Sequence, residues 1–370
     1  MARGQKVASL GESDARRGHS EVRTICLTYV ALFLQSISLN KIRRRPVFRS
    51  KIGFVFSGGA ARIAQECALT KALMEGLTPS GRKIRPDVVA GTSSGALNAV
   101  AVNAILKTKD GKAGKGMSWE DYKKILFDLD DGKIFDITPR GLARIVPRNI
   151  PEGFILDTAP LRRLLEEVLQ EKMGFRSLGD LYLPTYISVV GRDTGKTLRL
   201  YSRDPDPRIR KLPLLDVLMA STAIPVAFKP REIKGLKGSF FDGGVGRDGI
   251  PVEAMAAEHC RELYIISRMR GDETMTGVTV FKKRRPRVPK ILLNVLLAME
   301  YLIDALFESE LDRAPQIARR AFLYLPKLFK QYPLLDFSTQ REQYEETLEW
   351  AKKHDPVEIK KPRKRFLGLF

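Results

Sequence analysis

Residues 51–76 read KIGFVFSGGAARIAQECALTKALMEG, and residues 85–106 read RPDVVAGTSSGALNAVAVNAIL. Each segment begins with a short apolar run that is typical of a buried strand, passes through a turn of small residues, and continues with the apolar spacing of a helix. Gly76 closes the first of these helices. Two strand-to-helix units in succession indicate a parallel sheet, so the sequence predicts an α/β fold.

Further elements are expected along the rest of the chain. Helical spacing is found at 119–129, at 161–170 behind an N-cap at Asp157 or Thr158, at 291–311 and at 345–353. Strands are predicted at both ends of 185–202, joined through a turn at 193–195, and again at 239–242 and 263–268. The Gly- and Lys-rich residues 107–118 read as an exposed loop.

Three regions are expected. Residues 1–47 form an N-terminal extension that is partly disordered, residues 48–270 form the core, and residues 271–370 form a basic, mainly helical region that packs on the core. The apolar stretch 24–40 is shorter than the roughly 20 residues of a spanning helix, so a buried or interfacial helix is favoured over a membrane span. The following KIRRRP offers no signal-peptide cleavage site, and we expect a cytoplasmic protein with peripheral membrane association.

The composition limits the classes of molecule that the protein is expected to bind. The chain has 370 residues, 44% of them hydrophobic, which suffices for a large core, and its formal net charge of +21 favours an anionic membrane or nucleic acid. The basic clusters 41–45, 282–287 and 360–365 have no nucleic-acid-binding motif behind them, so an anionic membrane surface is preferred to nucleic acid. Three scattered cysteines are too few for a disulfide framework or a zinc cluster.

Two motifs point to chemistry. GTSSG at 91–95 matches G-x-S-x-G between a predicted strand and a predicted helix, which is the context that a nucleophile elbow requires. SGGAAR at 57–62 exposes backbone N–H groups at the start of a helix, and these suit a phosphate or the oxyanion of a tetrahedral intermediate. Each motif alone is also compatible with a small-residue turn made for packing.

Four motifs, read in order, resemble the patatin-like phospholipase and lipid acyl hydrolase family. They are GGAARIAQECALTKAL at 58–73, GTSSG at 91–95, ASTAIPVAFKP at 220–230 and DGG at 242–244. The resemblance covers roughly residues 48–266. It implies a three-layer α/β/α sandwich with a mainly parallel central sheet, and cleavage of acyl esters of lipids or phospholipids through an acyl-enzyme.

The resemblance also implies a site. Ser93 would be the nucleophile and Asp242 its base, without a histidine. A free aspartate has a pKa of about 3.9, so such a base needs a shielded position. Arg62 would brace the glycine loop or bind a substrate phosphate. The oxyanion hole would be formed by the amides of Gly58, Gly59 and Ala60. The family requires no metal or organic cofactor, and the sequence leaves head group, acyl position, chain length and oligomeric state open.

Two positions depart from the family pattern. Ala60 and Ile63 stand where the family usually has glycine. If either position requires positive φ, the side chain resists it, and a β-branched isoleucine resists it strongly. A catalytically weak patatin-like protein that binds lipid or membrane is therefore the alternative function, and a nucleic-acid-binding protein is the third.

Three competing motifs are weaker. His259 is the main contender for a Ser-His-Asp triad, but its surroundings read as a helix. Residues 191–197 are one residue short of a P-loop and precede a strand, so a hairpin turn is favoured. Residues 244–249 satisfy the dinucleotide pattern G-x-G-x-x-G, but no acidic residue ends a second strand at the expected distance.

Overall fold

The computed structural model describes residues 51–112, 114–135, 154–268 and 290–360. The chain divides into two units, Met1–Arg49 and Ser50–Phe370, and all that follows concerns the second. The expected N-terminal extension, with its apolar stretch 24–40, lies outside the described residues, as do the basic clusters 41–45 and 282–287. Among the described residues, no helix is both long enough and apolar enough to cross a membrane.

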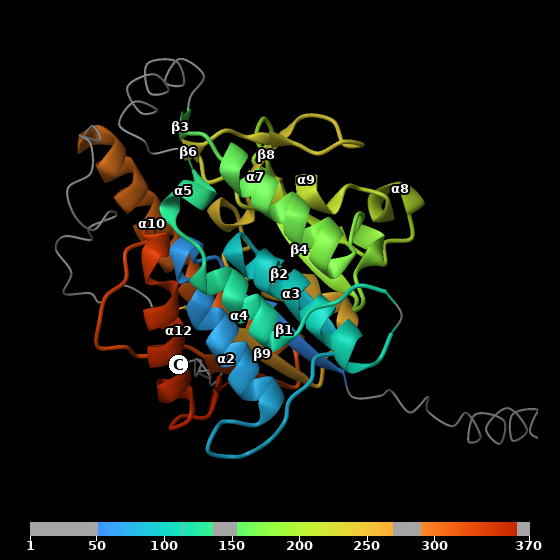
Figure 1. The fold of residues 1–370 in the computed structure, drawn as a ribbon, viewed down its shortest axis with the longest axis vertical. Coiled ribbons are helices and arrows are strands. Elements are labelled where there is room, and N and C mark those ends of the chain that lie inside the picture. Colours follow the sequence, from blue (N-terminus) through green and yellow to red (C-terminus); the bar gives the residue numbers. More distant parts are fainter. Residues whose placement is uncertain (1–50, 113, 136–153, 269–289, 361–370) are drawn as a thin grey trace, which may run out of the picture. The chain divides into compact units, whose positions relative to one another are not determined.

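A mainly parallel sheet forms the middle of the second unit (Figure 1). Five parallel strands of the described chain follow the order β10 (Arg320–Tyr324), β9 (Glu262–Ile266), β1 (Ile52–Phe56), β2 (Val88–Thr92) and β4 (Thr185–Gly191). Antiparallel strands complete the sheet: β5 (Thr197–Tyr201), β7 (Arg231–Glu232), β8 (Ser239–Asp242) and β11 (Val357–Glu358). A separate parallel pair is formed by β3 (Phe154–Leu156) and β6 (Val226–Phe228).

Apolar side chains leave both faces of the sheet. In β1, Phe54 and Phe56 belong to one buried cluster and Val55 to a second, because successive side chains of a strand point to opposite faces. The first cluster includes residues of α2 (Ile63–Glu75), α3 (Ser94–Lys109), α4 (Trp119–Phe127), α7 (Ala159–Glu166) and α9 (Leu214–Ser221). The second includes residues of η6 (Val252–Glu258), α10 (Lys290–Leu311) and α11 (Ala314–Ile317). Helices on both faces confirm the predicted three-layer α/β/α sandwich.

Several local predictions are confirmed by these elements. The helix predicted after the first glycine turn ends at Gly76, whose φ of +70° gives the left-handed cap that glycine adopts without strain. Residues 191–197 join the antiparallel strands β4 and β5, with Gly195 at a φ of +63°, so they form a hairpin turn and not a P-loop.

The C-terminal region contributes strands as well as helices. Strand β10 pairs with β9 in parallel and extends the central sheet, and β11 pairs with β10. Helix α12 (Gln340–Ala351) packs along α2, where the buried Gln343 accepts a hydrogen bond from Gln65. The described residues from 290 to 360 therefore supply strands to the central sheet and a helix that packs on α2.

Strand β2, which leads to Ser93, and strand β8, which ends at Asp242, both pair with β4. Strand β2 runs parallel to β4 and ends with Thr92 opposite Ser188. Strand β8 runs antiparallel to β4 and ends with Asp242 opposite Val189. Strand β5 pairs along the other edge of β4, so β2 and β8 share one edge end to end. The carboxyl ends of β2 and β8 therefore come together, although more than a hundred residues of chain separate them.

Candidate active site

Ser93 occupies a strained elbow between β2 and α3. Its φ of +55° and ψ of −131° lie in a region that non-glycine residues rarely adopt. A Cβ on Gly91 would lie 2.4 Å from the Gly95 carbonyl oxygen, and a Cβ on Gly95 would lie 2.3 Å from the Ser57 carbonyl oxygen. Both glycines of the G-x-S-x-G motif are thus required by close backbone approach. Strain of this kind is characteristic of functional positions.

The elbow is fixed by a second serine. The Ser93 amide donates a hydrogen bond to Ser221 Oγ at 3.0 Å, and Ser221 Oγ donates to the Ser188 carbonyl at 2.8 Å. Ser221 belongs to the ASTAIP segment, which sequence reasoning singled out as a motif without assigning this residue a role. Its position at the end of α9 places it against the elbow.

Asp242 lies beside Ser93. Its carboxylate accepts a hydrogen bond through Oδ1 from the Gly244 amide at 2.8 Å, and the Ser93 side chain lies near enough to lower its pKa. Asp242 is 4% exposed, and burial raises its pKa to about 6 against the opposing effects of Ser93 and the Gly244 amide. The structure therefore brings together the two residues predicted as a dyad, with the carboxyl group buried and its pKa raised.

The glycine loop lies against the elbow. A Cβ on Gly58 would be 3.1 Å from Ser93 Cβ. The Gly58 amide donates to the Gly249 carbonyl at 3.3 Å, and the Gly59 amide donates to Ser94 Oγ at 2.9 Å. Of the three amides expected to form an oxyanion hole, two thus have internal acceptors. In the described part of the chain, the Ala60 amide has none.

Ser94 is a site residue that sequence reasoning missed. Its hydroxyl ties the glycine loop to the elbow, and its amide is the first of helix α3. The first amides of a helix have no acceptor within the helix. The amide that follows the nucleophile is the usual oxyanion donor of a nucleophile elbow, and that rule could have identified Ser94 from the sequence.

Ala60 and Ile63, the two positions that depart from the family pattern, differ in backbone conformation. Ala60 has a φ of +44°, in the left-handed region that costs a non-glycine residue roughly 1 kcal/mol. Ile63 has an ordinary helical φ of −55°, because the chain has already entered α2 there. The concern that isoleucine would distort the loop therefore does not hold. Ile63 is buried and lines the pocket described below.

Two arginines hold the glycine loop from outside the pocket. Arg62 is 3% exposed, and its Nε donates to the Tyr332 carbonyl at 3.0 Å, which favours the bracing role over contact with substrate. Arg268, which the sequence analysis did not select, donates through Nε to the Gly58 carbonyl at 3.0 Å. Its side chain also fills the space that a Cβ on Gly59 would need.

A buried carboxyl connects the loop to helix α3. Glu66 is fully buried and accepts hydrogen bonds from Ser57 Oγ at 2.8 Å and from Asn98 Nδ2 at 3.0 Å. Asn98 Oδ1 accepts in turn from the Tyr122 hydroxyl at 2.7 Å. Burial raises the pKa of Glu66 to about 8. This network joins the strand before the loop, the helix after the elbow and one wall of the pocket.

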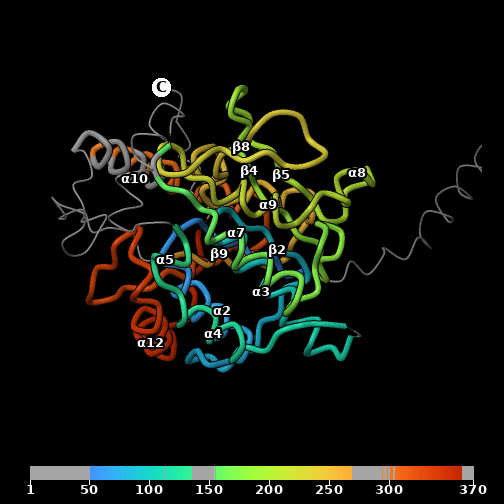
Figure 2. Tube along the Cα trace, turned by 45° about the horizontal axis from the view of Figure 1, so that its top comes forward, coloured from blue at the N-terminus to red at the C-terminus, as the bar shows by residue number. Residues whose placement is uncertain are grey.

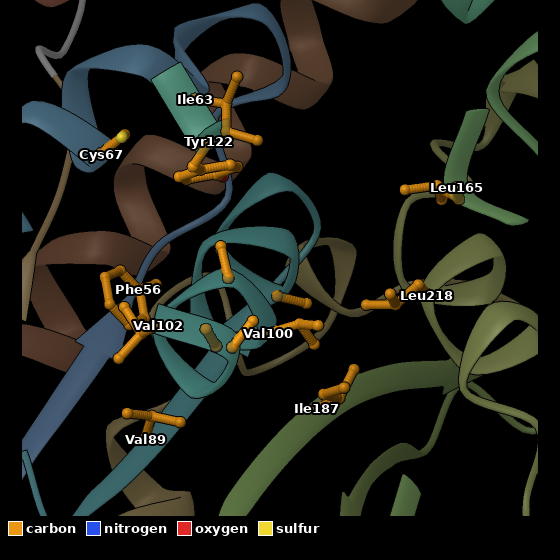
Figure 3. Packing of buried hydrophobic residues seen from close by; sticks show 14 of the residues in the cluster. Phe56, Ile63, Cys67, Val89, Val100, Val102, Tyr122, Leu165, Ile187 and Leu218 are labelled. Carbon is orange, nitrogen blue, oxygen red and sulfur yellow. The ribbon is translucent and has the colours of Figure 1, made fainter. Parts of the chain in front are cut away.

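An apolar pocket opens at Ser93. Its empty volume is about 880 Å³, open solvent at the mouth included. Figures 1 and 2 show α2 and α4 on one side of α3, and α7 and α9 on the other. Ile63 and Tyr122 face Leu165 and Leu218 across Val100 (Figure 3). Apart from Ser93, Ser94, Tyr122 and Thr222, the side chains that line the pocket are apolar.

The competing histidine lies away from this site. His259 is exposed and follows η6 just before β9, which places it near the amino ends of the parallel strands, whereas Ser93 follows a carboxyl end. His354 is exposed and stacks on Trp350, and His19 lies outside the described residues. Neither of the two described histidines lines the pocket.

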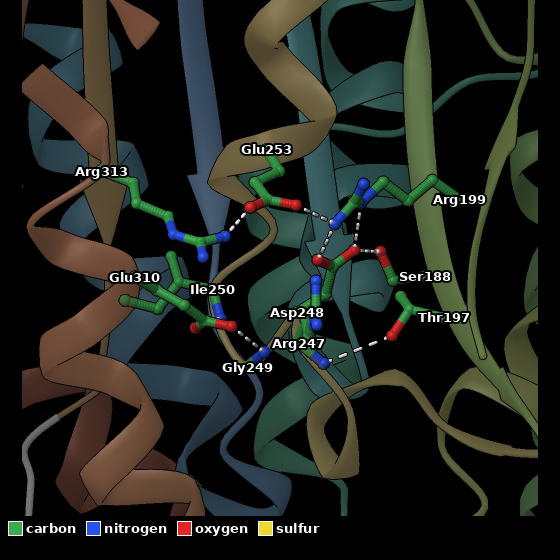
Figure 4. A network of polar contacts seen from close by, with 10 residues as sticks. All are labelled: Ser188, Thr197, Arg199, Arg247, Asp248, Gly249, Ile250, Glu253, Glu310 and Arg313. Atoms are coloured by element: carbon green, nitrogen blue, oxygen red, sulfur yellow. Dashed lines mark hydrogen bonds and ion pairs between the residues drawn. The ribbon is translucent and has the colours of Figure 1, made fainter. Parts of the chain in front are cut away.

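The G-x-G-x-x-G segment 244–249 is occupied by internal contacts (Figure 4). Its amides at 244, 246, 247 and 249 donate to acceptors within the protein. Asp248 is fully buried, pairs with Arg199 and accepts from the Ser188 hydroxyl. The Glu310 carboxylate of α10 accepts from the amides of Gly249 and Ile250. These amides are therefore not available to a pyrophosphate.

The fold and site together define a class of α/β protein in which a serine at a strained strand-to-helix elbow meets a buried carboxylate at the end of an apolar pocket. Residues 54–256, more than half of the chain, match the model of the patatin-like phospholipase family. The chain belongs to this family.

Two further similarities are more distant. A cGAMP-activated phospholipase of Escherichia coli is 28% identical over 161 residues, which are 43% of this chain and 40% of that protein. The chain thus spans less than half the length of this curated relative. The crystal structure of VipD from Legionella pneumophila aligns with 82% of this chain and 67% of its own at 16% identity and a TM-score of 0.39.

Proposed function

We propose that the protein is a serine hydrolase, a patatin-like phospholipase A or lipid acyl hydrolase, that cleaves acyl esters of lipids or phospholipids. Ser93 is the nucleophile and Asp242 the base in this proposal. The observation that carries it is that Ser93, at a strained elbow that lines an apolar pocket, lies beside the buried Asp242 carboxylate. Membership of the patatin-like phospholipase family supports the same activity.

The reaction has two halves. Asp242 takes the hydroxyl proton of Ser93 as Oγ attacks the ester carbonyl, and the amides of Ala60 and Ser94 receive the developing oxyanion. When the tetrahedral intermediate collapses, the leaving alcohol takes the proton from Asp242 and the acyl group stays on Ser93. Water then gives a proton to Asp242, attacks the acyl ester and releases the fatty acid, while the proton returns to Ser93.

The pocket fits the acyl part of such a substrate. Its wall is almost entirely apolar, as the walls of small-molecule sites usually are. A fatty acyl chain has no polar group that would need a partner there. The net charge of +21 supports contact with an anionic membrane surface at the cytoplasmic side, where lipid substrates are found.

Burst kinetics with a chromogenic ester test this function. With p-nitrophenyl laurate in excess, the purified protein is expected to release about one nitrophenol per Ser93 in a fast phase and then turn over steadily, because nitrophenol is a good leaving group and deacylation is then the slower step. A catalytically weak lipid-binding protein gives neither phase. If folded protein shows no burst and no turnover but binds vesicles, the alternative function replaces the hydrolase.

Hydrolysis is expected to fall at acid pH. Asp242 acts as a base only when ionised, and its pKa is about 6. Below that value kcat/KM should decrease by about tenfold per pH unit, and above it the acid limb should flatten. Rates measured with a soluble ester between about pH 4.5 and pH 8 check this, with circular dichroism at each pH to exclude unfolding. A profile that stays level through pH 6 contradicts the role of Asp242.

A further inference from the structure

Arg231 is a partly buried arginine without a carboxylate partner. Its Nη2 donates to Thr158 Oγ1, and its buried Nε has no hydrogen-bond partner. Within the described part of the chain it forms no ion pair, and burial lowers the pKa of its guanidinium. A buried donor that lacks an acceptor is rare in native proteins and requires an explanation.

The register of β7 places Arg231 on the same side of the sheet as Asp242. Arg231 pairs with Phe240 across the antiparallel strands β7 and β8. Directly paired residues share a face, and so do residues two apart along a strand, such as Phe240 and Asp242. Strand spacing and rise then put the Cα atoms of Arg231 and Asp242 about 9 Å apart.

Arg231 is close, along the chain and through its contact with Thr158, to residues that line the apolar pocket. Phe228, three residues before it, lines the pocket, and Thr158 precedes α7, whose Leu161 lines it as well. The neighbouring Lys229 lies 5.6 Å from the Phe154 ring centroid and adds a second cation to this edge.

Among the described residues, two charged neighbours act on the pKa of Arg231 in opposite directions. Asp157 raises and Arg162 lowers the pKa of Arg231, both less than burial does. The Asp157 carboxylate accepts from the Ala159 amide, and Arg162 pairs with Asp216. Neither neighbour neutralises the Arg231 guanidinium by direct contact.

We propose that Arg231 forms an anion subsite that binds the phosphate of a phospholipid head group next to Ser93 and Asp242. The proposal rests on the proposed function and deepens it by naming phospholipid as the substrate class. A guanidinium presents Nε and Nη as a planar fork that matches two phosphate oxygens. In a glycerophospholipid the phosphate is only a few bonds from the ester carbonyl, a span comparable with the separation of Arg231 from Asp242.

Substrate selectivity tests the subsite. The protein is assayed on dioleoyl phosphatidylcholine and on dioleoylglycerol in the same nonionic micelles, because the two lipids share their acyl chains and differ in the head group. For Arg231→Gln we expect kcat/KM on the phospholipid to fall about ten- to a hundredfold more than on dioleoylglycerol, mainly through KM. Phosphatidylcholine has no net charge, so general attraction to an anionic surface does not contribute.

Matched variants make the result specific. Arg163→Gln removes the same charge from an exposed position on α7 and should leave the selectivity unchanged. Arg231→Lys keeps the charge without the fork and should fall between wild type and Arg231→Gln. Partial unfolding lowers the rate on both lipids equally, so the ratio of the two rates separates it from loss of the subsite.

Three outcomes overturn the subsite. If Arg231→Gln affects both lipids equally or neither of them, Arg231 has a structural role. If inorganic phosphate inhibits the wild type on both lipids while Arg231→Gln leaves their ratio unchanged, the site binds free phosphate and not a head group. If the wild type hydrolyses neither lipid nor a chromogenic ester, the proposed function itself fails, and the subsite fails with it.

Discussion

Ser93→Ala protein is expected to lose covalent labelling by a fluorophosphonate probe completely and to lose about 10⁴-fold or more of its esterase activity. The probe reacts with an activated serine oxygen, and alanine removes the atom that the proposed mechanism makes nucleophilic. The fold should survive, because alanine keeps the small Cβ at the elbow and the Ser93 amide contact to Ser221 Oγ does not depend on the side chain. Intact mass before and after labelling measures the result.

The control for this experiment is an exposed serine outside the site. Ser309 lies exposed on α10, and Ser309→Ala should label like the wild type. Melting curves of both variants establish that they are folded. Labelling that persists in Ser93→Ala would place the reactive serine elsewhere and remove the basis of the proposed mechanism.

Asp242→Asn is expected to reduce both the labelling rate and kcat by about 10²- to 10⁴-fold, because an amide cannot take the proton of Ser93.

The same substitution should increase the free energy of unfolding above pH 6. The pKa of Asp242 is raised to about 6, so the folded state binds its proton more tightly than the unfolded chain does. The favourable contribution of its protonated form to stability is complete below about pH 4 and is lost as the pH rises through 6. Above that pH, folding is about 3 kcal/mol less favourable than at low pH.

A neutral asparagine avoids this cost, so Asp242→Asn at about pH 8 should be at least as stable as the wild type. Denaturant titration of the two proteins at this pH measures the difference. Asp193→Asn, in the exposed turn between β4 and β5, removes the same charge and should affect neither activity nor stability. Full labelling of a folded Asp242→Asn protein would show that Ser93 does not need this base.

The local part of the site could be predicted from the sequence. The requirement for glycine at 91 comes from the nearby backbone of Gly95, whereas the requirement at 95 comes from the carbonyls of Phe56 and Ser57 at the other glycine turn. The strands before both turns are continuous apolar runs. The P-loop pattern could be set aside because a strand follows it, and the dinucleotide pattern because no acidic residue ends a second strand at the expected distance. The dyad itself came from the family resemblance, and the structure provides its geometry through the shared edge of β4.

The supporting contacts could not be predicted, because they depend on tertiary packing. Arg268, Ser221 and Tyr332 reach the loop or the elbow from segments far along the chain. Which amide of the glycine loop remains without an acceptor depends on Gly249 and on Ser94. The pairing of β7 with β8 is likewise set by the fold, and the short strand β7 has no alternating pattern of its own.

The end-to-end meeting of β2 and β8 on β4 has a consequence for how this chain can change. Strand β4 sets the spacing between the two strand ends, because Thr92 of β2 pairs with Ser188 and Asp242 of β8 pairs with the adjacent Val189. Exposed connections elsewhere, such as the turn at 193–195, can lengthen or accept an inserted module without moving Ser93 relative to Asp242. A one-residue shift of either strand along β4 would instead separate the pair, because it turns the side chains of that strand to the other face of the sheet. The position of Ser93 relative to Asp242 thus depends on the register of β2 and β8 along β4.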